Sequence, residues 1–366
     1  MSTHTAMPWR TALPIWSIAF PFLGAALVLA NVAKMGAIGT AAAGIVLIGA
    51  VIAAVHHAEV VAHRVGEPFG TLVLALAVTV IEVALIVSLM LSGGPDVSTL
   101  ARDTVFAAIM IILNGIVGLC LLVGGLRHLE QRFTLRGAST ALSVLAAMAI
   151  LSLVLPNYVL SRPGPEFAPS QLIFLAIVSL VLYGTFVMVQ TVRHRDYFLP
   201  EDEPTSHDTH AEPPDNTATW AAFGILLIAL VAVVFLAKAL APTVEYAVKG
   251  AGLPVAIVGI VIASVVLAPE SLAALNAARR NRIQTSLNLA LGSALATIGL
   301  TIPAVAVISI LLDIPLSLGI DPKGMALLAL SLFISTLTLG TGRTTVLQGT
   351  VHLVILATYL FMTIVP

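Results

Sequence analysis

The sequence is poor in charged residues and in cysteine, and both shortages exclude whole classes of protein. Only 10% of the 366 residues are Asp, Glu, Lys or Arg, whereas a soluble domain carries roughly 25%. The net charge of −1 leaves no basic surface for a phosphate backbone, so we expect no nucleic-acid partner. Cys120 is the only cysteine, which excludes a disulfide framework and a thiolate metal site.

Hydrophobic residues dominate the composition instead. They make up 59% of the chain, and the mean hydropathy is +1.06. Apolar stretches near 20 residues are typical of membrane-spanning helices. The sequence therefore predicts an all-α polytopic membrane protein in a lipid bilayer, with about 11 transmembrane helices. We expect them at 13–30, 37–55, 68–91, 104–125, 138–155, 170–192, 220–240, 253–276, 287–312, 325–339 and 346–365.

One long polar segment, residues 193–219, divides these helices. It carries prolines, acidic residues and two histidines, His207 and His210, and it is predicted to be a solvated cytoplasmic linker. The chain then consists of an N-terminal segment with an extra helix (1–36), a first five-helix repeat (37–192), the linker and a second five-helix repeat (220–366). Halves with an odd number of spans enter the membrane in opposite directions, which is the plan of the inverted repeats of many transporters.

The distribution of Lys and Arg predicts the orientation. With the N-terminus in the cytoplasm, 11 of the 17 basic residues fall on the cytoplasmic side. We therefore expect a multi-pass protein of a bacterial inner membrane with a cytoplasmic N-terminus. The sequence leaves open whether the chain forms a homo-oligomer.

Two acidic residues lie deep in predicted helices, whereas the other acidic residues lie in loops, near helix ends or in the linker. Glu82 and Glu270 each occupy the second helix of a five-helix half. An ionisable group at membrane depth destabilises insertion by about 2.5–3.5 kcal/mol, so it is retained for function. Carboxylates at matching places in two inverted halves are expected to meet near the midplane. Such a pair cannot stay doubly charged without a counter-ion, so protons and a metal cation compete for it.

Polar and small residues near these carboxylates are candidates for lining the site. Thr79 lies three residues before Glu82, on the same helical face. Pro269 lacks an N–H, which is expected to leave the carbonyl of Val265 available to a cation. The helices that follow carry the remaining candidates, which are Asn114, Gly292, Ser293 and Thr297. Close helix packing is the alternative explanation for Ser293 and Thr297, and a structural kink for Pro269.

Two histidines and a glutamate at the end of the second predicted helix have a spacing that could also hold a metal ion. His56, Glu59 and His63 share a helical face, but a hydrated helix end is the favoured interpretation of their position. His352 lies in the last helix and is interpreted as a buried hydrogen-bonding residue rather than a member of a proton relay.

Four blocks of the chain together resemble the cation/calcium exchanger superfamily, and within it the bacterial ChaA-type antiporters. They are AEVVAHRVGEPFGTLVLALAVTVIEVALI, YGTFVMVQTVRHRDYF, LAPESLAALNAARRNRIQTSLNLALGSALATIGLTIP and GTGRTTVLQGTVHLVILATYL. The resemblance implies eleven helices, two inverted repeats and proton-driven cation export. It also implies that the essential acidic residues are Glu82 and Glu270, and that polar positions fall on Asn114, Gly292, Ser293 and Thr297.

The chain departs from the calcium/proton exchangers of that family. A Gly-Asn pair precedes each essential glutamate there, but Val78-Thr79 and Val266-Leu267 stand here, and an acidic position of the last block is Gln348. Because calcium takes six to eight oxygen ligands, this pattern leaves room for sodium or potassium.

The sequence thus predicts a cation/proton antiporter rather than an enzyme. Ca²⁺, Na⁺ or K⁺ would exchange for H⁺ at Glu82 and Glu270, which also form the predicted metal site, and no cofactor is expected. A passive cation channel using the same two acids is the main alternative. An intramembrane enzyme is disfavoured, because no hydrolase or protease motif lies at membrane depth.

Overall fold

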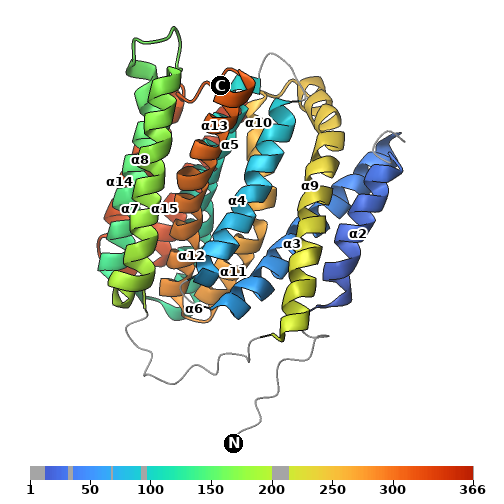
Figure 1. The fold of residues 1–366 in the computed structure, drawn as a ribbon. Helices are drawn as coiled ribbons and strands as arrows, with labels where there is room; N and C mark the ends of the chain where they lie inside the picture. The colour runs from blue at the N-terminus through green and yellow to red at the C-terminus, as the bar shows by residue number, and fades with distance from the viewer. Residues whose placement is uncertain (1–12, 32–35, 67–68, 92–96, 200–213, 366) are drawn as a thin grey trace, which may run out of the picture. The chain divides into compact units, whose positions relative to one another are not determined.

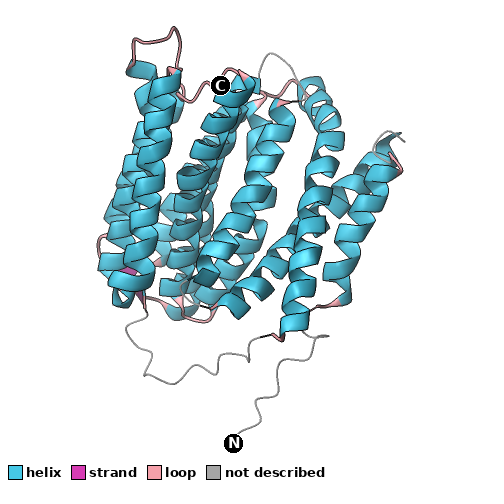
Figure 2. Ribbon diagram, in the orientation of Figure 1, coloured by secondary structure: helices cyan, strands magenta, loops and turns pink. Residues whose placement is uncertain are grey.

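The computed structural model describes residues 13–31, 36–66, 69–91, 97–199 and 214–365. These residues are almost entirely helical, and one short antiparallel pair of strands, β1 (Gln131–Arg132) and β2 (Arg343–Thr344), lies among them (Figure 2). The predicted all-α class is confirmed.

The helices before the polar linker begin with α2 (Ile15–Leu29), α3 (Gly36–Val65) and α4 (Phe69–Met90). A long span follows, made of α5 (Val97–Met110), the π-helical segment η2 (Ile111–Ile116) and α6 (Val117–His128). The last two spans are each extended by short segments. They are α7 (Leu135–Ala149) with η3 (Ile150–Val154) and η4 (Leu155–Tyr158), and α8 (Pro169–Met188) with η5 (Val189–Arg193) and η6 (Arg195–Phe198).

The helices after the linker run from α9 to α15. They are α9 (Asn216–Gly250), α10 (Ala256–Val266), α11 (Ala268–Arg279), α12 (Ile283–Ala296) with η7 (Thr297–Thr301) and α13 (Ile302–Leu312), α14 (Pro322–Leu339) and α15 (Val346–Ile364). In each half, the third span contains a π-helical segment, η2 in the first and η7 in the second.

Nine helices of the described residues are long and apolar enough to cross a membrane. The bent pair α10 and α11 counts as a tenth span if it is taken as one. The extra N-terminal helix α2 is apolar but has 15 residues, fewer than a straight span needs. The protein is therefore a multi-pass membrane protein, while the count of eleven spans stays a prediction.

The chain forms two compact units that do not coincide with the two predicted repeats. The first unit holds α2, α3, α4 and most of α9, and the second holds the other elements. Each unit thus combines helices from before and after the linker. Since spatial neighbours within a unit come from both halves of the sequence, a division by sequence alone does not describe the packing.

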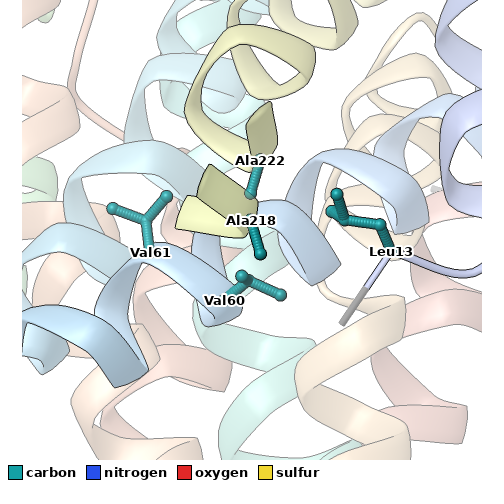
Figure 3. Close-up of a cluster of buried hydrophobic side chains, with 5 residues drawn as sticks. All are labelled: Leu13, Val60, Val61, Ala218 and Ala222. Carbon is teal, nitrogen blue, oxygen red and sulfur yellow. The ribbon is translucent and has the colours of Figure 1, made fainter. Parts of the chain in front are cut away.

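In the first unit, α3 packs against α2 and α4. Leu13, just before α2, meets Val60 and Val61 near the end of α3 and Ala218 and Ala222 at the start of α9 (Figure 3). A second cluster joins α3 and α9 further along, through Ala43, Val46, Leu236 and Leu240. The small alanines let α9 lie close to α3, and the helix that follows the linker is thereby tied to the N-terminal helices.

In the second unit, α6 packs against α15, α5 against α10, and α11 against both α6 and α12. Helices α7 and α8 stand side by side in Figure 1 and are also in contact. Helix α12 contacts α7, and η7 contacts α8. Two spans are the most buried of the described spans: Ser98–His128, which contains η2, and Ile283–Leu312, which contains η7.

Several boundaries differ from the predicted ones. Helix α3 continues to Val65 rather than ending near residue 55, because His56, His57 and Glu59 continue the helix where the sequence predicted its hydrated end. Part of the predicted linker is also folded. Phe198 is buried and packs edge-on against Phe186 of α8, so this residue of the segment is packed, whereas Arg195 and Asp196 are exposed. His207 and His210 lie outside the described residues.

Candidate functional site

Glu82 lies in the middle of α4 and is buried, with only 3% of its surface exposed. Leu76 and Val80 of the same helix are exposed, whereas Ile81 and Leu85 are buried, so Glu82 lies on the buried face of α4. This is the arrangement expected of a carboxylate that is retained in the membrane for function rather than one turned toward hydrocarbon.

Thr79 lies one helical turn before Glu82 on α4 and is also buried. It is 5% exposed, and its hydroxyl donates to the backbone carbonyl of Ala75 at 2.8 Å. This bond uses the hydroxyl hydrogen and leaves oxygen lone pairs, so Thr79 can still offer an oxygen to a cation or water near Glu82.

Glu270 lies where its span is broken. Helices α10 and α11 meet at an angle of 55° around Leu267, and Glu270 occupies the first turn of α11, directly after Pro269. Its side chain is half-buried. The backbone N–H groups and the dipole of a helix N-terminus favour negative charge, so this position suits an acidic side chain.

The predicted break at Pro269 is confirmed. The N–H of Leu267, at the end of α10, donates to the carbonyl of Ala263 at 2.9 Å. The chain turns at Leu267 (φ −81°, ψ −5°). Pro269 has no N–H to donate to the carbonyl of Val265, and the availability of this carbonyl to a cation stays a prediction.

The next candidate residues lie in the two π-helical segments, which the sequence did not indicate. Asn114 belongs to η2 and is fully buried, and Thr297 is the first residue of η7 and is 4% exposed. A π-helical turn holds one more residue than an α-helical turn, which displaces side chains from the regular face, and such turns are frequent at functional sites.

Asn114 is held by hydrogen bonds from two other helices. Its Nδ2 donates to Ser331 Oγ of α14 at 2.8 Å, and its Oδ1 lies 3.3 Å from His352 Nδ1 of α15. The other ring nitrogen, Nε2, lies 3.3 Å from Thr338 Oγ1. The prediction that His352 is a buried hydrogen-bonding residue is confirmed. Ser331 and Thr338 were missed, because serine and threonine in membrane helices usually bond within their own helix.

Gly292 and Ser293 lie on α12, and both are half-buried. A Cβ added to Gly292 would meet no heavy atom within 4 Å, so close helix packing does not explain this glycine. Gly299 gives the contrast, since a Cβ there would lie 2.6 Å from Cβ of Tyr183. The open space beside Gly292 is compatible with a place on the lining of an ion path.

The predicted site residues are divided between the two units. Thr79 and Glu82 belong to the first unit, whereas Asn114, Pro269 and Glu270 belong to the second, together with Gly292, Ser293 and Thr297. Within the second unit, η2 contacts both α11 and α12, so the elements that carry the second-unit candidates are neighbours. The meeting of the two glutamates stays a prediction.

The histidines of α3 form no metal site. Glu59 and His63 are exposed, and no group of three or more His, Cys, Asp and Glu side chains among the described residues is placed to hold a metal ion. His57, which the sequence did not single out, is fully buried, and its Nε2 donates to the carbonyl of Ser17 at 2.9 Å. It therefore fastens α2 to α3.

A cavity of about 260 Å³ lies where the ends of α5, α10, α14 and α15 meet, and its charged side chains already have hydrogen-bond partners. Arg102 bonds Asp103 at 2.8 Å and the carbonyl of Gly319 at 3.0 Å. Asp321 caps α14 through the N–H of Gly324 at 2.8 Å. These carboxylates hold the helix ends together, so the cavity is a weaker candidate for ion binding than the residues at membrane depth.

A multi-pass helical protein with carboxylates buried in its spans has the features of membrane proteins that bind or conduct ions. The family described as sodium/calcium exchanger protein matches residues 35–192 and 221–365. The chain belongs to this family, and the resemblance to the cation/calcium exchanger superfamily is confirmed.

Relatives of similar length carry names of ion transporters. The chain is 51% identical to a protein of Sinorhizobium fredii provisionally named an ionic transporter, covering 97% of each chain. It is 37% identical to the sodium-potassium/proton antiporter ChaA of Escherichia coli, covering 86% of this chain and 85% of that protein. The Ca²⁺/H⁺ antiporter of Aphanothece halophytica is 25% identical over 82% of each.

Two solved structures share the fold. The structure of native YfkE matches with a TM-score of 0.71 at 17% identity, covering 94% of this chain and 100% of that one. The crystal structure of the H⁺/Ca²⁺ exchanger CAX matches with a TM-score of 0.69 at 15% identity, covering 93% and 87%. At these identities the likeness establishes the architecture of the chain.

Proposed function

We propose that this protein is a secondary active antiporter that exports Ca²⁺, Na⁺ or K⁺ from the cytoplasm in exchange for H⁺. Glu82 and Glu270 bind protons and the cation alternately. The observation that carries the proposal is the burial of Glu82 at membrane depth, together with the placement of Glu270 at the break of the corresponding span in the other half.

The relatives support this class of activity. The family match falls on one stretch before the linker and one after it, which supports two related repeats in inverted orientation. The relative from Escherichia coli is named a sodium-potassium/proton antiporter, and the more distant one from Aphanothece halophytica is named a Ca²⁺/H⁺ antiporter. Exchange of a cation for protons is common to both names.

Electrostatics explains why such a pair couples the two ions. A low-dielectric surrounding disfavours two adjacent negative charges, so the empty site takes up protons. A metal cation neutralises the same charges and displaces those protons. Since the site is neutralised by protons or by metal but not by both, each ion leaves only when the other replaces it. When the site turns back to the other side of the membrane, it therefore carries the competing ion.

The ligands near the glutamates bear on the choice of cation. Thr79 offers one neutral oxygen beside Glu82 where calcium/proton exchangers carry a Gly-Asn pair. Gln348, at an acidic position of the last block, accepts the N–H of Thr345 at 2.6 Å and caps α15, so it serves the helix end. Fewer oxygen ligands suit Na⁺ or K⁺ better than strict Ca²⁺ selectivity.

The proposal includes the surroundings of the site. The chain lies in a bacterial inner membrane with its N-terminus in the cytoplasm. In the second unit, Pro269, Asn114, Gly292, Ser293 and Thr297 line the path. Rocking or sliding of the repeats opens the site to one side at a time. Where the exchanged charges are unequal, the membrane potential adds about 2.3 kcal/mol per charge per 100 mV.

Everted membrane vesicles with a pH-sensitive dye test the proposal. Adding Ca²⁺, Na⁺ or K⁺ separately to vesicles acidified by respiration should raise the internal pH, and the response identifies the cation. Glu82→Gln and Glu270→Gln should each abolish the response, because an amide cannot exchange a proton for metal. Glu130→Gln is the matched control, since Glu130 lies near the exposed β1 strand and contacts Arg132 and Arg343 at 3.7 and 3.5 Å.

Two results would contradict the proposal. Near-normal responses in both glutamine variants, at normal protein levels in the membrane, would refute the assignment of the site. Cation flux that persists without any counter-flow of protons would instead indicate a passive channel using the same acids.

A further inference from the structure

A chain of four buried side chains links three elements of the second unit. Asn114 of η2 joins Ser331 of α14 on one side and His352 of α15 on the other, and His352 reaches Thr338 of α14. Asn114, Ser331 and His352 are 0% exposed, and Thr338 is 5% exposed. Buried polar groups of this kind are retained when their hydrogen bonds specify one arrangement.

The bonds of Ser331 fix which way the amide of Asn114 points. The Ser331 hydroxyl donates to the backbone carbonyl of Leu327 at 2.7 Å, so its oxygen is left to accept a hydrogen bond. The group of Asn114 that lies 2.8 Å from this oxygen must be a donor, which makes it the NH₂ group. The side-chain carbonyl of Asn114 therefore points toward His352.

This orientation in turn fixes the hydrogen on the imidazole. A carbonyl oxygen only accepts, so Nδ1 of His352, at 3.3 Å, is the donor to Asn114. Nε2 then accepts from the hydroxyl of Thr338 at 3.3 Å. With the ring neutral and the hydrogen on Nδ1, each of these bonds among the four side chains joins one donor to one acceptor.

Two glycines hold the ring in this place. A Cβ on Gly118 of α6 would lie 3.0 Å from Cβ of His352, and a Cβ on Gly349 would lie 2.4 Å from the backbone nitrogen of Leu122. Helices α6 and α15 therefore approach each other at backbone distance, as small residues allow in membranes. The close approach presses His352 against the span that carries Asn114.

We infer that His352 is a positioning residue for the ion site, which acts by donating its Nδ1 hydrogen to the carbonyl of Asn114. This bond occupies one lone pair of the carbonyl and directs the other toward the position of a transported cation. The inference rests on the proposed function, in which Asn114 lines the path. Outer hydrogen-bond partners of this kind orient ligands and strengthen them.

Three variants of His352 separate the donor from the rest of the ring. In His352→Asn, the amide NH₂ takes the place of Nδ1 and can still donate to Asn114. In His352→Gln, the longer amide reaches the place of Nε2, beside Thr338, and leaves Asn114 without its donor. His352→Leu removes both. Thr358→Val is the control, because the exposed hydroxyl of Thr358 on the same helix bonds only the carbonyl of Val354 in the contacts described.

Two measurements are made on the full-length protein. The first is the KM and kcat of cation-induced proton release in everted vesicles, and the second is the rise in Tm of the detergent-purified protein with increasing cation. We expect His352→Gln and His352→Leu to raise KM and the half-saturating cation concentration about tenfold, the low end for loss of an outer-shell partner. In His352→Asn and Thr358→Val, KM and the half-saturating cation concentration should stay within about threefold of the wild-type values. In all four variants, kcat should change little.

Equal behaviour of the Asn and Gln variants would overturn the inference. If both match the wild type, His352 only fills space, and if both fail equally, the imidazole itself is required. Ser331→Ala gives an independent check, since it removes the acceptor that orients the same amide and should also raise KM. A wild-type protein without cation-induced proton release would refute the proposed antiport, and the Tm series would still decide the role of His352.

Discussion

Thr79 allows a test of how much a single neutral oxygen beside the buried Glu82 contributes to cation binding. Its hydroxyl hydrogen is used by Ala75, so only the oxygen lone pairs remain for an ion near Glu82. Thr79→Val keeps the shape of the side chain and removes this oxygen. We predict that KM for the transported cation rises about fivefold, since a net hydrogen-bond-like contact contributes about 1 kcal/mol. Initial rates in everted vesicles over a range of cation concentrations measure this.

The serine variant makes the prediction for Thr79 specific. Thr79→Ser retains the oxygen and should keep KM near the wild-type value. Thr40→Val is a control in the same unit, because the hydroxyl of Thr40 bonds the carbonyl of Gly36 at 3.1 Å near the start of α3. A normal KM in Thr79→Val would mean that this oxygen does not face the ion.

At the level of residues, the sequence predicted the acids better than their partners. Glu82 stood out because charge at membrane depth is costly, and Asn114 stood out because a neutral amide is also costly to bury. Ser331 and Thr338 carried no such signal, since hydroxyls are satisfied by the preceding helical turn in any membrane helix. Their partnership with Asn114 and His352 depends on three elements meeting, which a pattern along one helix cannot indicate.

The contact between α6 and α15 depends on a pair of glycines. A Cβ at position 349 would lie 2.4 Å from the nitrogen of Leu122 and 2.8 Å from the oxygen of Gly118, both backbone atoms that cannot turn aside. We predict that Gly349→Ala separates the helices and lowers stability by about 1–3 kcal/mol, as overpacking does. Thermal unfolding of the detergent-purified protein measures the change as a fall in Tm.

Gly184 of α8 supplies the control for this contact. A Cβ there would meet no heavy atom within 4 Å, so Gly184→Ala should leave Tm unchanged or raise it, because alanine favours a helix over glycine by up to about 1 kcal/mol. Equal effects of the two substitutions would show that loss of glycine, rather than contact between α6 and α15, changes stability.

At the level of elements, local chemistry could be predicted and helix irregularities could not. Pro269 predicted the broken span, because a missing N–H acts on its own helix. The bend itself lies at Leu267, a position that the proline alone did not specify. The π-helical segments η2 and η7 were not predicted, since one extra residue in a turn leaves the apolar pattern on both sides intact.

At the level of the whole molecule, the order of helices along the chain indicated two halves, but the packing crosses them. Helix α9 follows the linker, yet its alanines pack against α3 and the residues before α2. Contacts of this kind join residues far apart in sequence, and the hydrophobic pattern is equally satisfied by lipid or by another helix. The linker thus connects two units that each draw on both halves.

Competition between protons and the cation makes affinity depend on pH, and the sign follows from the proposed site. Protons occupy the carboxylates of Glu82 and Glu270 as pH falls, so the cation must displace them and binds more weakly. We predict that the half-saturating cation concentration rises by up to about tenfold per pH unit for each proton displaced. The cation-dependent rise in Tm, recorded in buffers of decreasing pH, measures this concentration without any need for transport.

The variant Glu82→Gln removes one titrating carboxylate, so any cation binding that it retains should vary less steeply with pH. A half-saturating concentration that stays constant as pH falls would separate cation binding from protonation, and the coupling would then have to arise elsewhere than in a shared site.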